Sequence, residues 1–372
     1  MGAMVLVRLG LLLCLSGQIH AIKRATTKAF THPGGMHPQQ QIDFVRTKVA
    51  QREQPYYDAY TQLIKSADAA FNHSTHELAD FSVPGYYVNA TMHQKNSAGL
   101  QSDSFDAYAC ALAYHLSGFQ AKYADQSLRF LRAWAHVNNK YSDYDGTLVM
   151  AYSGPGMVIA GELLYHYHGW NPVDQQKYLQ WVKNVYLKAS NEIRTRTNNW
   201  ADWGRFGSIL SGYLLENSTE IAENIRLIKK DLFHKIAQDG HMPEETKREA
   251  NGIWYTYFSL APITAACWVA YRATNENLFT NFTQGTASIK LALDYLHYYN
   301  MNSNFWPWYP NPNKGSPSSW PGNLLEAMAP IYGSDSFVDY VKAARPLIYR
   351  NHHFAWTFPT LMRTQLGDYP KK

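Results

Sequence analysis

The sequence predicts an all-α protein, an (α/α) toroid of paired helices that forms one domain over residues 22–372. Three observations favour this fold class. Apolar residues recur at helical spacing in about eleven segments, strand-like alternation is sparse, and most of the intervening loops are short. Hydrophobic residues make up 46% of the 372 residues and charged residues 17%, which excludes a disordered chain.

The predicted helices begin after the Pro- and Gly-rich segment HPGG and continue almost to the carboxyl end. Gly118 and Gly169 stand where two of them are expected to stop, and Ser218 is a candidate cap before another. The stretch from Asn300 to Pro321 is predicted to be a loop that is long enough to be functional, and packing of an ordered loop onto the helices is the alternative. The expected helices are Gln40–Ser66, Ser104–Leu116, Gln126–Val137, Met157–His168, Val173–Ala189, Asn199–Leu215, Ser218–Ala237, Ile253–Ala273, Thr283–Tyr298, Asn323–Tyr332 and Ser336–Tyr349.

The first 21 residues are predicted to be a secretory signal peptide. One Arg precedes the apolar run Leu9–Leu15, and the segment ends in small and polar residues, with Ala21 as the expected cleavage point. No later run is long and apolar enough to suggest a membrane span, so no membrane association is expected. Four N-x-[ST] sequons agree with secretion and predict a glycoprotein, at Asn72, Asn89, Asn217 and Asn281.

The cysteines and the net charge set further bounds. The mature chain keeps Cys110 and Cys267 in apolar, helical-looking stretches, which favours two buried free thiols over a single disulfide. No Cys/His spacing resembles a metal site, and no cofactor is expected. The formal net charge of +5 is not gathered into a basic stripe, which argues against nucleic acid and is compatible with an acidic polysaccharide.

The segment Asp239–Thr274 is the first candidate for chemistry, because it runs from a turn through charged residues into an apolar helix. Arg248 and Tyr255 are seven residues apart, so a helix that covered both would place them on one face. A phenolate beside a guanidinium is stabilised and can act as a base or an acid. An exposed Arg and a half-buried Tyr without such a role is the alternative.

The second candidate is the segment NNWADWGRFGS, with two Asn and two Trp at the start of a predicted helix. The amides of Asn198 and Asn199 could donate hydrogen bonds to a carboxylate, and helix capping is their alternative role. Trp200 and Trp203 could stack on a sugar face or pack in the core.

Together these segments resemble the alginate lyase superfamily, polysaccharide lyase families 5 and 38. That superfamily has an N-N-H segment, then D-G and E-x-x-R, a Tyr seven residues after the Arg, and Ala-Pro in an apolar helix. The counterparts here are Asn198-Asn199-Trp200, Asp239-Gly240, Glu245–Arg248, Tyr255 and Ala261-Pro262. The HPGG segment with its following helix, and the stretch Ala109–Ala135, are also similar, so the resemblance covers most of the mature chain.

The resemblance implies a lyase that cleaves β-1,4-linked uronic acid polymers by β-elimination. Tyr255 would be the catalytic base and acid, and Asn199 would neutralise the substrate carboxylate. Arg248 would lower the pKa of Tyr255 or hold that carboxylate, and Glu245 would orient Arg248. When the C5 proton and O4 lie on the same side of the sugar, one Tyr can serve both steps. This predicts glucuronan or polymannuronate as the substrate and little activity on polyguluronate.

Trp200 departs from the motif, since the superfamily has His at this position. Three explanations remain open: His241 replaces that residue from a facing loop, Tyr255 works unaided, or activity is lost. From the long loop, Trp306 and Trp308 are expected to line a sugar groove or to pack against the helices.

Two other functions compete with the lyase. A glycoside hydrolase on the same toroid would need two carboxylates across a groove, with Asp202 and Glu244 or Glu245 as candidates. The second competing function is that of an inactive protein that only binds acidic polysaccharide. The sequence-based expectation is a secreted, monomeric lyase.

Overall fold

The computed structural model describes residues 29–350 and 352–370, so the predicted signal peptide lies outside the described residues. Over that range the all-α prediction is confirmed. The helices are α1 (Gln39–Ala50), α2 (Tyr56–Ala69), α3 (Ala90–Leu116), α4 (Ala121–Val137), α5 (Gly146–Ser153), α6 (Pro155–Leu163), α7 (Pro172–Trp181), α8 (Leu187–Ile193), α9 (Asn199–Leu214), α10 (Ser218–Lys235), α11 (Pro243–Thr246), α12 (Gly252–Thr274), α13 (Ile289–Met301), α14 (Gly322–Tyr332) and α15 (Asp335–Val341).

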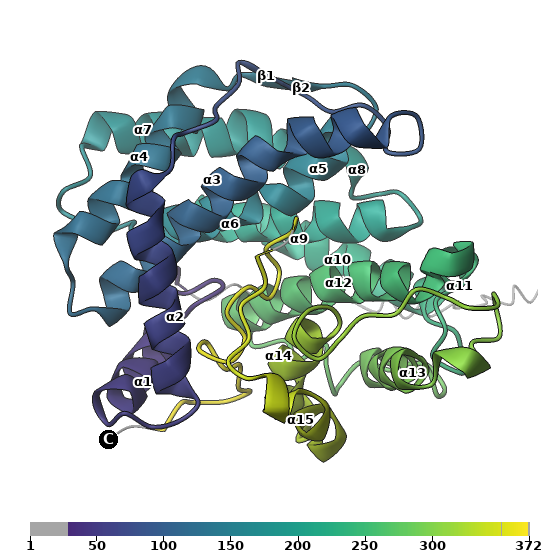
Figure 1. The fold of residues 1–372 in the computed structure, drawn as a ribbon. Helices are drawn as coiled ribbons and strands as arrows, with labels where there is room; N and C mark the ends of the chain where they lie inside the picture. Colours follow the sequence, from purple (N-terminus) through teal and green to yellow (C-terminus); the bar gives the residue numbers. More distant parts are fainter. Residues whose placement is uncertain (1–28, 351, 371–372) are drawn as a thin grey trace, which may run out of the picture.

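Neighbouring helices run antiparallel to one another and pack around a continuous apolar core (Figure 1). α9 and α12 lie side by side and form the largest helix contact, and α9 also packs on α8 and α10. The chain after α15 returns to the centre of the view in Figure 1. In this segment His353 packs on Trp203 of α9 and is hydrogen-bonded to the Tyr257 hydroxyl of α12 at 2.8 Å. The carboxyl-terminal segment therefore contacts both central helices.

Some predicted helices have different limits, and the causes are local. The predicted Gln40–Ser66 is divided before Pro55, because proline lacks an amide hydrogen and disfavours a helical residue before it. The last predicted helix ends at Val341, and Pro346 lies beyond a short 3₁₀ turn. Conversely, α3 starts at Ala90 rather than at Ser104, since the Asn89 side chain caps it by accepting from the Met92 amide at 3.0 Å.

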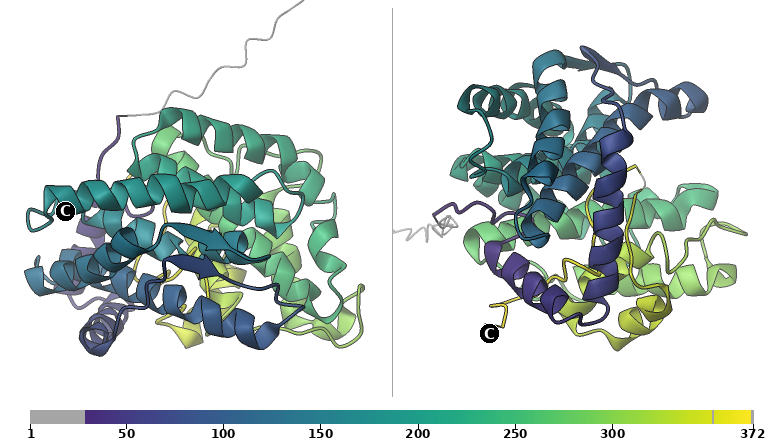
Figure 2. Two further views of the ribbon diagram at one scale, coloured as in Figure 1. Left: turned by 90° about the horizontal axis from the view of Figure 1, so that it is seen from above. Right: turned by 60° about the vertical axis from the view of Figure 1, so that its left-hand side comes forward.

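Two short strands complete the described fold. β1 (Asp80–Ser82) and β2 (Lys140–Ser142) pair in parallel, with Phe81 opposite Tyr141. Figure 2 shows them side by side in the view from above. They connect the segment before α3 with the segment before α5, so both segments are held at the same end of the helices.

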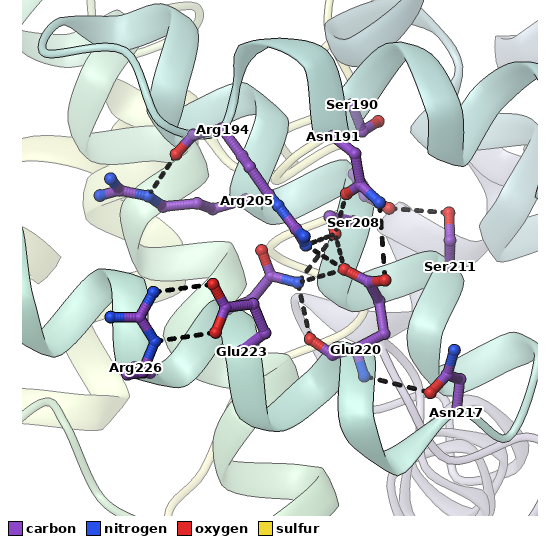
Figure 3. Close-up of polar contacts among 12 residues, drawn as sticks. Ser190, Asn191, Arg194, Arg205, Ser208, Ser211, Asn217, Glu220, Glu223 and Arg226 are labelled. Atoms are coloured by element: carbon purple, nitrogen blue, oxygen red, sulfur yellow. Dashed lines mark hydrogen bonds and ion pairs between the residues drawn. The ribbon is translucent and has the colours of Figure 1, made fainter.

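A buried polar network fixes the outer face of α9 against α8 and α10 (Figure 3). The Ser208 hydroxyl lies 2.7 Å from both Glu220 Oε1 and Asn191 Oδ1, and Arg194 is paired with Glu220. These groups satisfy one another inside the packed helices, which is the condition for burying them without a large desolvation cost.

Other features of the described residues bear on the sequence predictions. Cys110 and Cys267 are both buried free thiols. Among the described helices none has the length and apolar character needed to cross a membrane. No cluster of three or more His, Cys, Asp or Glu side chains suited to a metal ion occurs in the described part of the chain.

Candidate active site

A cleft of about 870 Å³ lies at the amino-terminal ends of α9 and α12. Its walls also include the segment before α3, the first turns of α3, the start of α5, Asn313 and Trp320 of the long loop, and His352. Segments from six parts of the chain therefore meet in one hollow. Of the residues singled out from the sequence, the cleft brings together Tyr255, Arg248, Asn198, Asn199 and Trp200.

Tyr255 lies in the first turn of α12, half-buried at the cleft wall. Arg248 precedes that helix, and its guanidinium carbon lies 4.2 Å from the centre of the Tyr255 ring. The pair is thus formed across a short turn and not along one helix face. The Tyr87 hydroxyl is hydrogen-bonded to the Tyr255 hydroxyl at 2.8 Å and accepts from Arg248 at 3.2 Å.

The protonation of Tyr255 follows from these neighbours. Burial raises its pKa above the ordinary value, the hydrogen bond between the Tyr255 and Tyr87 hydroxyls raises it further, and Arg248 acts in the opposite direction. The net direction is upward, so the phenol carries its proton at neutral pH. Arg248 favours a lower pKa of Tyr255, as expected, but desolvation of the buried hydroxyl outweighs this effect.

The two asparagines at the start of α9 have different partners. Asn198 caps the helix, and its side-chain oxygen accepts from the Trp200 amide at 3.2 Å. Asn199 is only 2% exposed and donates from its backbone and side-chain nitrogens to the two oxygens of Glu245, each at 2.8 Å. Glu245 therefore orients Asn199, whereas the sequence-based expectation assigned it to Arg248.

The Glu245 carboxyl is buried beside a second acid. Burial raises its pKa from 4.5 to about 7; the bonds from Asn199 oppose this change, and the nearby Asp202 adds to it. Asp202 accepts from Lys235 at 2.8 Å and from the Ser259 hydroxyl at 2.5 Å. Lys235 also donates to the Asn198 carbonyl at 2.9 Å, so this buried pair supports the start of α9.

The raised pKa of Glu245 predicts a pH-dependent stability. The folded protein keeps this proton up to about pH 7, whereas the unfolded chain releases it near 4.5, so the contribution is complete below 4.5 and is lost as the pH rises to 7. We expect Glu245→Gln to remove that decline, because glutamine does not titrate. Melting temperatures measured across this window, with Glu244→Gln as the surface control, test the prediction. An unchanged pH dependence in Glu245→Gln would contradict it.

Trp200 faces the cleft, but its ring is covered. The Arg196 guanidinium carbon lies 3.8 Å from its ring centre, and Tyr144 meets it edge-on at 5.9 Å. Both Arg196 and Tyr144 line the cleft and are exposed. This corner therefore offers a cation and an aromatic edge to a ligand.

Five other predicted site residues do not line the cleft: Glu245, described above, and His241, Trp203, Trp306 and Trp308. His241 pairs with Asp239 at 2.5 Å and packs on Trp308 at 4.8 Å, which places it in a separate aromatic cluster. Trp306 is buried against Tyr295, and Trp203 is fully buried behind the cleft. His241 thus does not take the place of the missing histidine, and core packing explains Trp203 and Trp306.

Several cleft residues were not anticipated from the sequence. They are Tyr87, His93, Asp145, Tyr152 and His352. His93 lies in the first turns of α3, and Asp145 directly precedes α5. No local pattern marks these positions, since their partners are distant in sequence and meet only through the β1–β2 pairing and the helix packing.

The carboxylates in the cleft argue against a hydrolase. Among the described residues that line it, Asp145 is the single carboxylate, and it accepts from the Tyr86 amide at 2.8 Å. The candidate acids Asp202 and Glu245 are buried and engaged, and Glu244 is paired with Lys247 at 2.7 Å. Glycoside hydrolysis needs two carboxyl groups that face the substrate.

Several solved structures are similar to this chain in fold. The chain is similar to the structure of an alginate lyase from Bacteroides ovatus, with a TM-score of 0.71 and 18% identity over 89% of this chain and 99% of that chain. It is also similar to alginate lyase A1-III from Sphingomonas species A1, with a TM-score of 0.69 and 14% identity over 90% of this chain and 99% of the other. A variant of A1-III complexed with a tetrasaccharide gives a TM-score of 0.71 at 14% identity, over 90% of this chain and 96% of the other.

At these identities the likeness shows the fold, and it confirms the predicted α/α toroid. A comparison with curated proteins found no match. The family model described as alginate lyase matches residues 43–306, which is more than half of the chain and includes Asn199, Arg248 and Tyr255. The chain therefore belongs to the alginate lyase family and is a polysaccharide lyase.

Proposed function

We propose that this protein is a secreted lyase that cleaves β-1,4-linked uronans with same-side geometry at C4 and C5, either glucuronan or polymannuronate. One observation carries the proposal. Tyr255, Arg248 and Asn199 all line one cleft of about 870 Å³. The cleft carries the cations Arg196 and Arg248, for neither of which an ion-pair partner is found among the described residues, and this suits a polyanion.

In the proposed reaction Tyr255 removes the C5 proton and then delivers a proton to O4 as the glycosidic bond breaks. The C5–H bond and the C4–O4 bond are lost, and a C4=C5 double bond forms. Arg248 stabilises the phenolate that must exist before proton removal, and a substrate that displaces Tyr87 also removes a contact that raises the pKa of Tyr255. Asn199, oriented by Glu245, is the proposed donor to the uronate carboxylate.

Secretion is proposed on separate grounds. The first 21 residues have the composition of a signal peptide, and Asn72, Asn89, Asn217 and Asn281 are all exposed. Asn89 and Asn217 cap helices through their side-chain oxygens, which leaves their amide nitrogens available for a glycan.

The test is the ultraviolet absorbance of unsaturated uronate ends during incubation with glucuronan, polymannuronate and polyguluronate. We expect absorbance to rise on at least one of the first two and to stay near the baseline on polyguluronate. A rise on polyguluronate alone would contradict the same-side mechanism. Binding of all three polymers without any product would instead favour the inactive binding protein.

A further inference from the structure

A second histidine site lies in the cleft, outside the motif residues. His93 on α3 is 8% exposed and lines the cleft together with Asp145 and Tyr152. Its Nδ1 lies 2.9 Å from the Pro84 carbonyl oxygen and 3.2 Å from Asp145 Oδ2. Both of these oxygens are acceptors, so Nδ1 carries a hydrogen, and the imidazole is held with Nε2 directed away from them.

The Nε2 edge of the His93 ring lies near other side chains that line the cleft. Nε2 is 3.4 Å from the Tyr152 hydroxyl, a long contact that leaves the nitrogen open to a better partner. The Tyr86 ring lies 5.4 Å from the His93 ring and 5.5 Å from the Tyr87 ring. The Tyr86 ring therefore contacts both His93 and Tyr87, whose hydroxyl is hydrogen-bonded to that of Tyr255.

The charged groups around His93 favour its protonated form. Burial opposes the imidazolium, but the hydrogen bonds to Asp145 and to the Pro84 carbonyl raise the pKa of His93 above 6.5. The other cleft histidine, His352, stacks on Trp254 at 5.6 Å, and burial lowers its pKa to about 4. Tyr86, Tyr152 and His352 are the other titratable groups that face His93, and none of them is a carboxyl group.

A bound uronan presents more carboxylates than the motif residues can bind. One hydrogen of the Asn199 amide is donated to Glu245, which leaves one for the substrate, and Arg248 is packed on Tyr255 and hydrogen-bonded to Tyr87. A bound uronan places one carboxylate on every sugar, so a further fixed donor in the cleft has an obvious ligand.

We propose that His93, held by Asp145, binds a carboxylate of the uronan as an imidazolium, through a hydrogen bond from Nε2. The inference rests on the proposed function and adds a pH-dependent substrate contact to it. Asp145 is 6% exposed and is satisfied by His93 and the Tyr86 amide, so its charge is compensated before the polyanion arrives. Substrate binding should then weaken as the pH rises through the titration of His93.

The matched variant is His93→Asn, in which the amide nitrogen replaces Nδ1 and keeps the bonds to Pro84 and Asp145 while Nε2 is lost. The probe is a mannuronate or glucuronate oligosaccharide, whichever polymer the protein cleaves, titrated by calorimetry across a pH series. Tyr255→Phe is the common background, so that the ligand is bound without turnover. We expect the dissociation constant to rise roughly 10- to 100-fold in His93→Asn, as for the loss of a charged hydrogen bond, and its pH dependence to flatten.

Two further variants separate binding from structure. Asp145→Asn keeps the imidazole but removes the charge that raises its pKa, so the loss of affinity should begin at lower pH. His136→Asn makes the same substitution at a surface histidine, whose Nε2 lies 3.2 Å from Asp174 Oδ1, and it should leave affinity unchanged.

If His93→Asn keeps the affinity and the pH dependence of its parent while the wild type cleaves uronan, this inference is wrong and the proposed function stands. If the wild type neither binds nor cleaves any uronan, both proposals are wrong.

Discussion

Replacing Tyr255 with phenylalanine is expected to lower the rate of uronan cleavage by roughly 10²- to 10⁴-fold, the usual contribution of a positioned acid or base. The variant keeps the aromatic ring and its contact with Arg248, and it loses only the hydroxyl that is hydrogen-bonded to Tyr87. The loss should appear in kcat, because the hydroxyl acts on the breaking bonds and little of the substrate depends on it for binding.

The measurement is the initial rate of ultraviolet absorbance on the preferred polymer, at saturating substrate. Tyr298→Phe, at an exposed tyrosine of α13, is the matched control and should keep the wild-type rate. A Tyr255→Phe variant that is folded and retains wild-type turnover would show that another group handles both protons.

The largest effect on stability is expected for Lys235→Met. Lys235 is 6% exposed and is the cation that pairs with the buried Asp202, at 2.8 Å. Methionine fills a similar volume but leaves the carboxylate without its counter-charge, and breaking such a pair from one side costs about 3–5 kcal/mol. The Asn198 carbonyl also loses a donor, so the start of α9 should loosen.

Urea unfolding followed by circular dichroism measures this loss of unfolding free energy. Lys230→Met lies on the exposed face of the same helix and should change stability by no more than about 0.5 kcal/mol. Asp202→Asn combined with Lys235→Met should recover part of the loss, because the unpaired charge is removed. Equal stability of the two methionine variants would mean that the Asp202 pair contributes nothing net.

The sequence by itself determined the fold class and the positions that carry the family motif. Helical periodicity predicted α9, α10, α12 and α14 closely, since their apolar faces and caps are local properties of the chain. Some errors fell where a proline interrupts a periodic segment, as at Pro55 and Pro346, or where polar residues begin a helix, as in α3; α5 was not predicted at all. The motif order likewise placed Asn199, Arg248 and Tyr255 in one cleft.

Only the tertiary structure decided what surrounds those residues. Burial reverses the expected direction of the Tyr255 pKa, and Glu245 turns out to hold Asn199. His93 and Asp145 reach the cleft because β1 and β2 pair and bring two distant segments to the same end of the helices. Desolvation and long-range contacts depend on the whole packed chain, so no local sequence pattern reports them.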